Sequence, residues 1–240
     1  MATVRSAGKG RAICETPVPV PKPLRIFHIT AIPNLERIAK SKMLHANAVL
    51  QKKKIQHANI AYQGAQGKRA TKLVAKPPGG VIHDYVPFYF APRSPMLMAI
   101  NGGRVEGCTY RQQDIVHFAT TAEAILEHGL AFVFYDYNAT LDFANCYSDL
   151  RDLDKIDWDL FHEAPRLDGY CAYWFSNVNK HRYILRMETR QAEFLVHKSV
   201  PLNLMNVVGV CTPEKATEVQ EIFDDQDINI PVEVKTAWYY

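Results

Sequence analysis

The chain has 240 residues, of which 48% are hydrophobic, 22% charged and 11% aromatic, and its formal net charge is +3. This composition excludes disordered, collagen-like and mucin-like chains, and no apolar run approaches the roughly 18 residues that a membrane-spanning helix needs. The N-terminus lacks the apolar core of a signal peptide, so a cytoplasmic protein is expected. The cysteines include no C-x-x-C pair, which argues against a disulfide framework and a structural zinc site.

Residues 1–23 are predicted to form a flexible, Pro-rich tail, because alternating prolines favour an extended segment with no core to bury. These prolines are Pro17, Pro19, Pro21 and Pro23. No internal repeat and no linker divides the chain after this point. Residues 24–240 are therefore predicted to form a single domain.

The first predicted elements are a strand over residues 24–29 and a helix over 33–44, where apolar residues recur at helical spacing. Residues 45–85 are polar and punctuated by glycine, so they are predicted to be largely irregular. Further strands are predicted at 86–91, 114–119, 130–135, 183–187, 192–197 and 207–211. Helices are predicted at 95–100, 120–129, 150–161 and 212–225.

Two of these helices carry start signals. A capping box at Thr120–Glu123 opens one, and Thr212 with Pro213 opens the last. Strands and helices are mixed without strict alternation. The predicted fold class is therefore α+β and not a doubly wound parallel sheet.

The charges are distributed unevenly along the chain. From Gln51 to His83 there is no Asp or Glu, and the basic residues there are Lys52, Lys53, Lys54, Lys68, Arg69, Lys72 and Lys76. A second basic stretch runs from Lys180 to Arg190, whereas acidic residues gather at 149–159 and 214–227. Such separation predicts a positive face that attracts phosphates, although solvated lysines remain the alternative for Lys52–Lys54.

The common nucleotide and hydrolase motifs are missing. The sequence has no G-x-x-x-x-G-K-[ST] phosphate loop, no G-x-G-x-x-G after a strand, no H-E-x-x-H and no G-x-S-x-G. The nine histidines show no ligand-type spacing, so no metal site is expected.

Three residues are candidates for chemistry. His28 ends the first predicted strand directly before a helix, where polar groups and free N–H groups converge; a structural histidine is the alternative. Arg69 lies in the acid-free segment and is either a phosphate ligand or a solvated side chain. Glu193 stands in an otherwise apolar strand, either on the solvent face of an edge strand or held in a cleft. Spacing alone decides none of these.

Longer strings carry a family resemblance. FHIT followed by NLERI, then HDYVPFYFAPRSPMLMAI and RQAEFLVHKSVPL, resemble the DarT family of bacterial toxins that ADP-ribosylate single-stranded DNA. The resemblance covers about residues 24–223 and is closer to the thymidine-modifying branch than to the guanosine-modifying one. It implies an ADP-ribosyltransferase fold with two facing antiparallel or mixed sheets, peripheral helices and an NAD⁺ cleft. It also implies transfer of ADP-ribose from NAD⁺ to a base nitrogen, thymine N3 in that branch, with release of nicotinamide.

The resemblance assigns roles to the candidate residues. Glu193 matches the family's catalytic glutamate, which can stabilise an oxocarbenium-like transition state. Arg69 matches the catalytic arginine, which either clamps the NAD⁺ pyrophosphate or lies against the target base. Because an arginine side chain is a poor base, with a pKa above about 12, charge stabilisation is physically easier than proton acceptance, although the family favours an acceptor role.

The remaining cleft residues follow from the same resemblance. NAD⁺ is expected to contact His28, Ile29, Thr30, Arg37, His45 and Arg69. The cleft floor is expected to contain His83, Asp84, Tyr85 and Arg93. Tyr89 and Phe90 are expected to be core residues, because they lie in a strand pattern.

Single-stranded DNA needs positive charge along its backbone and flat groups on which bases stack. The residues expected to supply charge are Lys68, Lys72, Lys76, Arg182, Arg186 and Arg190. The aromatic residues available for stacking, some of which must be core, are Tyr62, Tyr173, Trp174, Phe175 and Tyr183. Residues 147–190 match the family only loosely, so the target base is the least constrained expectation.

The resemblance further implies a macrodomain antitoxin that reverses the modification. A monomer with no membrane association is expected. The alternatives are modification of guanosine, RNA or protein by the same fold, or a nucleic-acid-binding module without catalysis. A metal hydrolase has no ligand set to support it.

Overall fold

A computed structural model describes residues 18–240 of the chain. Most of the tail predicted over 1–23 lies outside the described residues. At its end, Val18 donates its backbone N–H to Asp159 Oδ1 at 2.7 Å. No helix within 18–240 is long and apolar enough to cross a bilayer.

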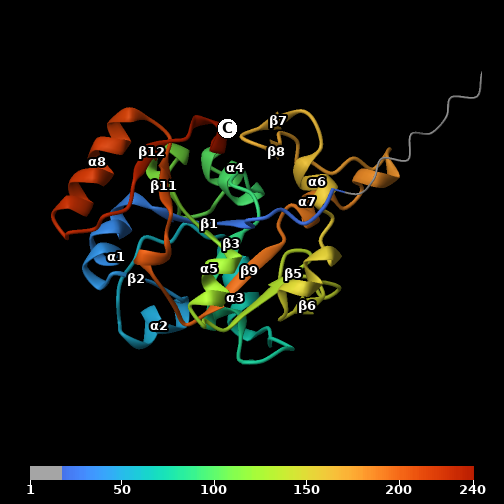
Figure 1. The fold of residues 1–240 in the computed structure, drawn as a ribbon, viewed down its shortest axis with the longest axis horizontal. Helices are drawn as coiled ribbons and strands as arrows, with labels where there is room; N and C mark the ends of the chain where they lie inside the picture. The colour runs from blue at the N-terminus through green and yellow to red at the C-terminus, as the bar shows by residue number, and fades with distance from the viewer. Residues whose placement is uncertain (1–17) are drawn as a thin grey trace, which may run out of the picture.

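A mixed sheet of eight strands organises the molecule (Figure 1). From one edge to the other its strands are β12 (Val232–Val234), β11 (Val207–Val210), β4 (Ile115–Thr121), β1 (Arg25–Ala31), β3 (Tyr85–Tyr89), β9 (Glu193–His197), β5 (Phe132–Tyr135) and β6 (Cys146–Tyr147). Only β11 and β12 pair in parallel. The central strands are buried on both faces, which agrees with their nearly continuous apolar sequences.

The sheet consists of two halves that meet at a narrow junction. β1 and β4 are in register over seven residue pairs and β3 and β9 over five, but β1 and β3 share only Phe27↔Tyr89. The sheet therefore divides into two halves, β12–β11–β4–β1 and β3–β9–β5–β6, which are joined through this one residue pair. The expected two sheets correspond to these halves, and the predicted α+β class is confirmed.

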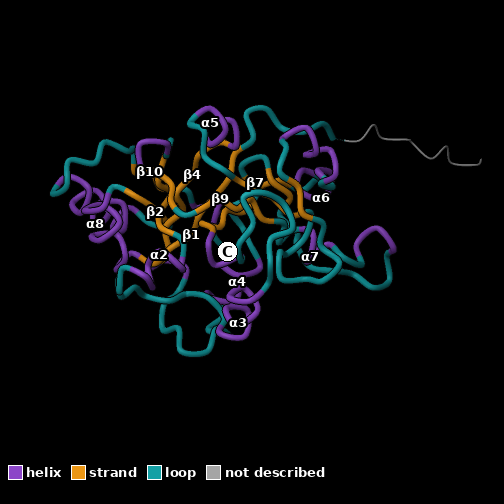
Figure 2. The backbone as a smooth tube through the Cα atoms, turned by 90° about the horizontal axis from the view of Figure 1, so that it is seen from below, coloured by secondary structure: helices purple, strands orange, loops and turns teal. Residues whose placement is uncertain are grey.

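Helices cover both faces of the sheet, with α5 on one side and α3 and α4 on the other (Figure 2). The α-helices are α1 (Leu35–Ser41), α2 (Asn47–Lys52), α3 (Gln63–Thr71), α4 (Pro95–Asn101), α5 (Ala122–Glu127), α6 (Trp158–His162), α7 (Arg186–Thr189) and α8 (Pro213–Asp224). The short 3₁₀ helices include η1 (Ile32–Asn34), η2 (Ile82–Asp84), η4 (Leu150–Lys155) and η5 (His181–Tyr183). Two small ribbons complete the fold, β2 (Met43–His45) with β10 (Ser199–Pro201) and β7 (Arg166–Leu167) with β8 (Tyr170–Cys171).

Aromatic side chains fill the core between these layers. Phe27 of β1 packs edge-on against Trp238 and Tyr170, with ring centroids 5.1 and 5.7 Å apart. Phe90 packs edge-on against Phe194 on the other half of the sheet. Each half-sheet thus has its own aromatic contacts, and the junction lies between them.

Several sequence predictions of local structure are wrong. The helix expected to reach residue 44 ends at Ser41, because Lys42 adopts a left-handed conformation (φ 54°). The region 45–85 contains α2 and α3; neither has a buried side chain, so neither produces an apolar stripe in the sequence. The strand expected over 183–187 is instead η5 and α7.

The helix-start signals hold more closely. Thr212 caps α8 through a hydrogen bond from Lys215 N–H. α5 is capped by Thr121, one residue later than predicted, and the Glu123 carboxylate accepts instead from Leu24 N–H. The predicted helix over 150–161 is divided into η4 and α6.

Candidate functional site

A cavity lies over the junction of the two half-sheets. Its floor comes from β1 (His28, Ile29 and Thr30) and from β3, and its walls come from α1, β2, residues 55–61, α3 and η2. No Asp or Glu is among the residues that line it. The narrow β1–β3 junction thus forms the base of a cavity whose charged side chains are basic.

Arg69 and Glu193 meet beside this cavity although 124 residues separate them. Arg69 Nη1 donates to both carboxylate oxygens of Glu193, at 2.9 and 2.8 Å. The Glu193 side chain is 2% exposed and the Arg69 side chain 13%. Since β9 pairs with both β3 and β5, Glu193 is not on the solvent face of an edge strand.

Tyr89 of β3 is the register partner of both Glu193 and Phe27. It lines the cavity, contrary to the expectation that it is a core residue, whereas Phe90 is buried in the core as expected. Burial, reinforced by the nearby Glu193 carboxylate, raises the pKa of the Tyr89 hydroxyl. This hydroxyl therefore remains protonated at neutral pH, and it points to Met96 Sδ at 3.3 Å.

His28 is fixed as a neutral ring. Its Nδ1 lies 2.8 Å from the Pro87 carbonyl oxygen, which can only accept, so Nδ1 carries the proton. Burial lowers the pKa of His28 to about 4. Nε2 is therefore an unprotonated acceptor at neutral pH. His28 can thus keep its structural bond through Nδ1 and accept a hydrogen bond from a ligand through Nε2.

The other expected NAD⁺ residues also line the cavity. Thr30 accepts a hydrogen bond from Asn34 Nδ2 at 3.0 Å, and Arg37 donates to the Gln56 carbonyl. His45 lies on β2 with Nδ1 2.7 Å from Ser199 Oγ and Nε2 3.2 Å from Lys53 Nζ. Because an ammonium can only donate, His45 Nε2 accepts from Lys53.

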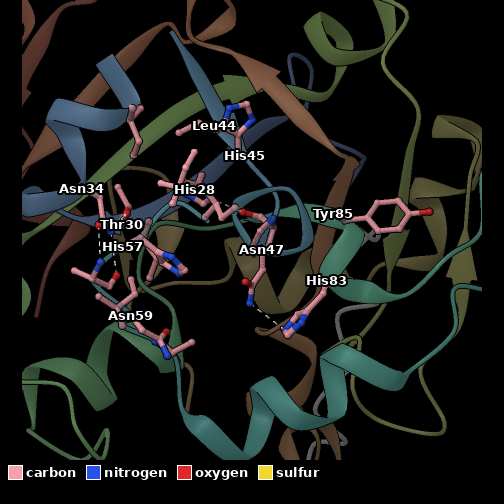
Figure 3. Close-up of a pocket in the computed structure, with 18 of the residues that line it drawn as sticks. His28, Thr30, Asn34, Leu44, His45, Asn47, His57, Asn59, His83 and Tyr85 are labelled. Atoms are coloured by element: carbon pink, nitrogen blue, oxygen red, sulfur yellow. Dashed lines mark hydrogen bonds between the residues drawn. The ribbon is translucent and has the colours of Figure 1, made fainter. Parts of the chain in front are cut away.

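Several polar cavity residues were not predicted from the sequence. They are Asn34, Asn47, His57, Asn59 and Gln66 (Figure 3 labels the first four). Most lie in the stretch predicted to be irregular. Had residues 63–71 been recognised as a helix, Gln66 and Arg69 would have been placed on one face by their i, i+3 spacing.

The expected cleft floor is only partly correct. His83 lines the cavity, with Nε2 2.7 Å from Gln66 Oε1. The Tyr85 side chain points away from the cavity histidines (Figure 3), and its hydroxyl donates to Gly79 O. Asp84 instead caps η2 by accepting from Val81 N–H, and Arg93 packs over the Tyr240 ring. Asp84 and Arg93 do not line the cavity.

The expected DNA-binding lysines lie on and after α3. Lys68 and Lys76 are exposed, and neither side-chain ammonium has a hydrogen-bond or ion-pair partner within residues 18–240. Lys72 is half-buried, and its ammonium donates to the Leu141 carbonyl oxygen. Two of the three lysines thus present uncommitted charge.

The three expected DNA-binding arginines are already engaged within the protein. Arg182 is paired with Asp157 at 2.8 Å and with Asp159 at 3.4 Å. Arg186 is 7% exposed, pairs with Glu163 and stacks on Tyr183. Arg190 is 1% exposed.

This burial corrects the expectation that Arg186 and Arg190 contact a DNA backbone. Arg190 Nη1 donates to the carbonyl oxygens of Cys171 and Tyr173, both at 3.0 Å. Its guanidinium carries no acidic partner in the described part of the chain, and burial lowers its pKa to about 10. It remains charged at neutral pH but faces the interior.

The candidate stacking residues also divide. Tyr62, Tyr173 and Phe175 are each 56% exposed, whereas Trp174 is buried beneath the Phe175 ring at 4.0 Å. Tyr183 is covered by Arg186. Across residues 18–240, no group of three His, Cys, Asp or Glu side chains is placed to hold a metal ion.

Comparison with known proteins gives a consistent result. A family model described as ssDNA thymidine ADP-ribosyltransferase, DarT, matches residues 27–240. A DNA ADP-ribosyl transferase of Thermus sp. (strain 2.9) is 37% identical over 92% of this chain and 98% of that protein. Another, from Escherichia coli O127:H6, is 28% identical over 92% of this chain and 95% of that protein.

Solved structures agree. Thermus sp. 2.9 DarT in complex with ADP-ribosylated ssDNA matches with a TM-score of 0.83 at 34% identity, covering 94% of this chain and all of that one. The same protein in complex with NAD⁺ matches with a TM-score of 0.77 at 32% identity, covering 92% of this chain. Thermosipho africanus DarTG in complex with ADP-ribose, at 17% identity and a TM-score of 0.70, shares the fold.

Proposed function

The chain belongs to the DarT family of single-stranded-DNA thymidine ADP-ribosyltransferases, and we propose that it transfers ADP-ribose from NAD⁺ to thymine N3 in single-stranded DNA. The observation that carries this proposal is the ion pair between half-buried Arg69 and buried Glu193, beside a cavity with no acidic lining residue. Such a cavity suits a dinucleotide whose pyrophosphate is negatively charged.

In the reaction, the bond between the nicotinamide nitrogen and the ribose anomeric carbon breaks, and its electron pair leaves with nicotinamide. A bond from thymine N3 to that carbon forms, and N3 loses its proton. Glu193 would stabilise the positive charge that develops on the ribose, because it is a buried carboxylate beside the cavity, paired with the lining residue Arg69. Held by two strand ladders, it needs no rearrangement to do so.

Arg69 has two possible tasks at this site. It could accept the N3 proton or stabilise the thymine as that proton leaves. The second is favoured because its Nη1 already donates to both Glu193 oxygens, which is the behaviour of a charged guanidinium.

The residues proposed to hold NAD⁺ are His28, Ile29, Thr30, Arg37, His45 and Arg69, all of which line the cavity. His28 Nε2 offers an acceptor and Thr30 a hydroxyl, so together they can orient an amide and a ribose. Arg37 and His45 lie on the α1–β2 side, with Lys53 behind His45. This side is therefore suited to anionic parts of the ligand.

Single-stranded DNA is the proposed acceptor, because N3 of thymine is hydrogen-bonded in a duplex. Lys68 and Lys76 would contact the backbone, and Tyr62, Tyr173 and Phe175 are exposed for base stacking. We further propose action as a monomer in the cytoplasm and a macrodomain protein that removes the modification.

Oligonucleotides that each lack one base test the acceptor. The purified chain is incubated with NAD⁺ and each oligonucleotide, and intact mass is measured. A gain of one ADP-ribose that disappears only without thymine supports the proposal. Loss tied to guanine would move the chain to guanosine chemistry, and labelling of RNA or protein alone would overturn the DNA assignment.

Replacement of the buried glutamate tests the site. Glu193→Ala is expected to lower transfer at least ~100-fold, because a preorganised charge at the reacting centre is lost. Binding of single-stranded DNA, measured by fluorescence anisotropy, should stay within about twofold, since the lysines are untouched. Glu36→Ala, an exposed glutamate on α1, is the matched control. Loss of DNA binding in Glu193→Ala would instead assign Glu193 a structural role.

A further inference from the structure

The helix that carries Arg69 is weakly held by packing. α3 has nine residues, none of them buried, and no side chain caps its N-terminus. Gly64 and Gly67 lie inside it, and each interior glycine costs roughly 1 kcal/mol of helix stability relative to alanine. Helices shorter than about 12 residues are marginal by themselves, so tertiary contacts must fix its position.

Within residues 18–240, only two α3 side chains make hydrogen bonds outside the helix, and they lie on one face. Arg69 bonds to Glu193, and Gln66, three residues earlier, bonds to His83 and Asn47. Since Arg69 reaches Glu193 through a single nitrogen, its geometry depends directly on where the helix lies.

The side-chain oxygen of Gln66 accepts hydrogen bonds from two residues outside α3. His83 Nε2 lies 2.7 Å from Gln66 Oε1, and Asn47 Nδ2 lies 3.3 Å from the same oxygen. An amide oxygen only accepts, so His83 and Asn47 both donate to it. His83 is 9% exposed, and Figure 3 shows it beside Asn47 at the cavity wall. One oxygen thus ties α3 to both α2 and η2.

We propose that Gln66, held by His83 and Asn47, is a positioning residue that fixes α3 so that Arg69 reaches Glu193. The inference rests on the proposed function, because it assigns Gln66 a role through the Arg69–Glu193 pair. Gln66 lines the cavity, but its side-chain oxygen is already committed to His83 and Asn47. Its effect on the reaction is assigned to the location of Arg69, which lies on the same helix face.

The test replaces the amide without changing length or helix propensity. Gln66→Met removes the acceptor, and Gln63→Met, at an exposed glutamine of the same helix, is the matched control. Single-turnover rates with enzyme in excess are measured by intact mass of the oligonucleotide. We expect Gln66→Met to slow transfer by about 10- to 100-fold, because a displacement of about 1 Å can cost that much. Gln63→Met should stay within about twofold, and Tm should change little in either variant.

A second background separates positioning from general stability. Arg69→Lys keeps the positive charge but loses the planar donor fork. In this background, Gln66→Met should lower the transfer rate by less than about a further twofold, because the group that Gln66 positions is already altered. A further loss of about tenfold in that background, or a wild-type rate in Gln66→Met alone, would overturn the proposal. The proposal would also be overturned if Gln66→Met lowered the Tm and its rate loss simply added to that of Arg69→Lys.

Two further arms keep the outcome decisive. If Gln66→Met fails to fold, His83→Leu removes the hydrogen-bond donor to Gln66 instead. The same rate losses are then expected for His83→Leu, alone and in the Arg69→Lys background. If the wild-type chain labels no DNA, the proposed acceptor fails by itself. The rate losses are then measured on nicotinamide release from NAD⁺, which still tests the role of Gln66.

Discussion

Two stretches of this chain are both basic in the sequence, but the structure exposes the charge of one and pairs or buries that of the other. Between residues 51 and 83, Lys68 and Lys76 are exposed without partners, and Arg69 faces the cavity. Between residues 180 and 190, Arg182 is paired with aspartates, and Arg186 and Arg190 are buried. Within residues 18–240, no lysine of the first stretch is paired with a carboxylate, and its Arg69 pairs with Glu193 beside the cavity. In the second stretch, Arg182 and Arg186 pair with Asp157, Asp159 and Glu163. Charge is available to a ligand only where the fold leaves it unpaired.

The largest expected effect comes from the buried arginine of the second stretch. Arg190→Met should lower the free energy of unfolding by about 3–5 kcal/mol, because the carbonyls of Cys171 and Tyr173 lose their buried donor. Urea denaturation measures this, with Arg182→Met as the exposed control, expected to cost at most about 1 kcal/mol. If Arg190→Met were as stable as the wild type but bound DNA more weakly, Arg190 would be a DNA-binding residue and not a structural one.

A pH scan tests whether the cavity floor is buried like the core. Burial lowers the pKa of His28, on the cavity floor, and of the core residue His117 to about 4 each. The unfolded chain protonates both near pH 6.5, so below that pH it binds more protons than the folded chain. The free energy of unfolding should therefore fall by up to about 1.4 kcal/mol per pH unit per histidine from pH 6.5 to 4, and no further below.

The matched variants for this scan are His117→Gln and His128→Gln. His117→Gln should remove its own share of the slope, up to about 1.4 kcal/mol per pH unit, whereas the exposed His128→Gln is the control. Thermal unfolding at a series of pH values measures both. A flat profile of His117→Gln between pH 6.5 and 5 would show that the cavity floor is solvated.

The smallest expected effect is on single-stranded DNA affinity, which should depend on the first basic stretch and not on the second. Replacing both Lys68 and Lys76 by Gln should weaken single-stranded DNA binding by about tenfold at low salt and reduce the salt slope by about 1.4, or 0.7 for each contact. Arg182→Gln should change neither quantity, since its charge is paired with Asp157 and Asp159. An equal loss in both variants would remove the distinction between the stretches.

The strands were the most predictable part of the fold. β1, β4, β9 and β11 have apolar or alternating sequences that follow directly from burial in a sheet. α3 was missed because it has no buried side chain, and α7 because the two side chains that it buries, Arg186 and Thr189, are polar, so neither sequence carries an apolar helical stripe. The Ile184–Leu185 pair suggested a strand, yet both side chains are more than 40% exposed.

Part of the candidate site also followed from the sequence. The resemblance placed His28, Arg69 and Glu193 together, and the structure brings Arg69 and Glu193 into contact. The burial of Arg190 was not predictable, because its partners are main-chain carbonyls 17 and 19 residues away that any sequence would supply. The same holds for Gln66, whose two donors come from separate segments.

The unequal anchoring of the Arg69–Glu193 pair has a consequence for how such proteins diverge. Glu193 is built into the ladders of two neighbouring strands, so most substitutions around it also endanger the sheet. Arg69 is carried by a surface helix without buried side chains, where a substitution can alter the site without disturbing the core. Changes in this helix can therefore alter contacts with a ligand while the carboxylate stays in place in the sheet.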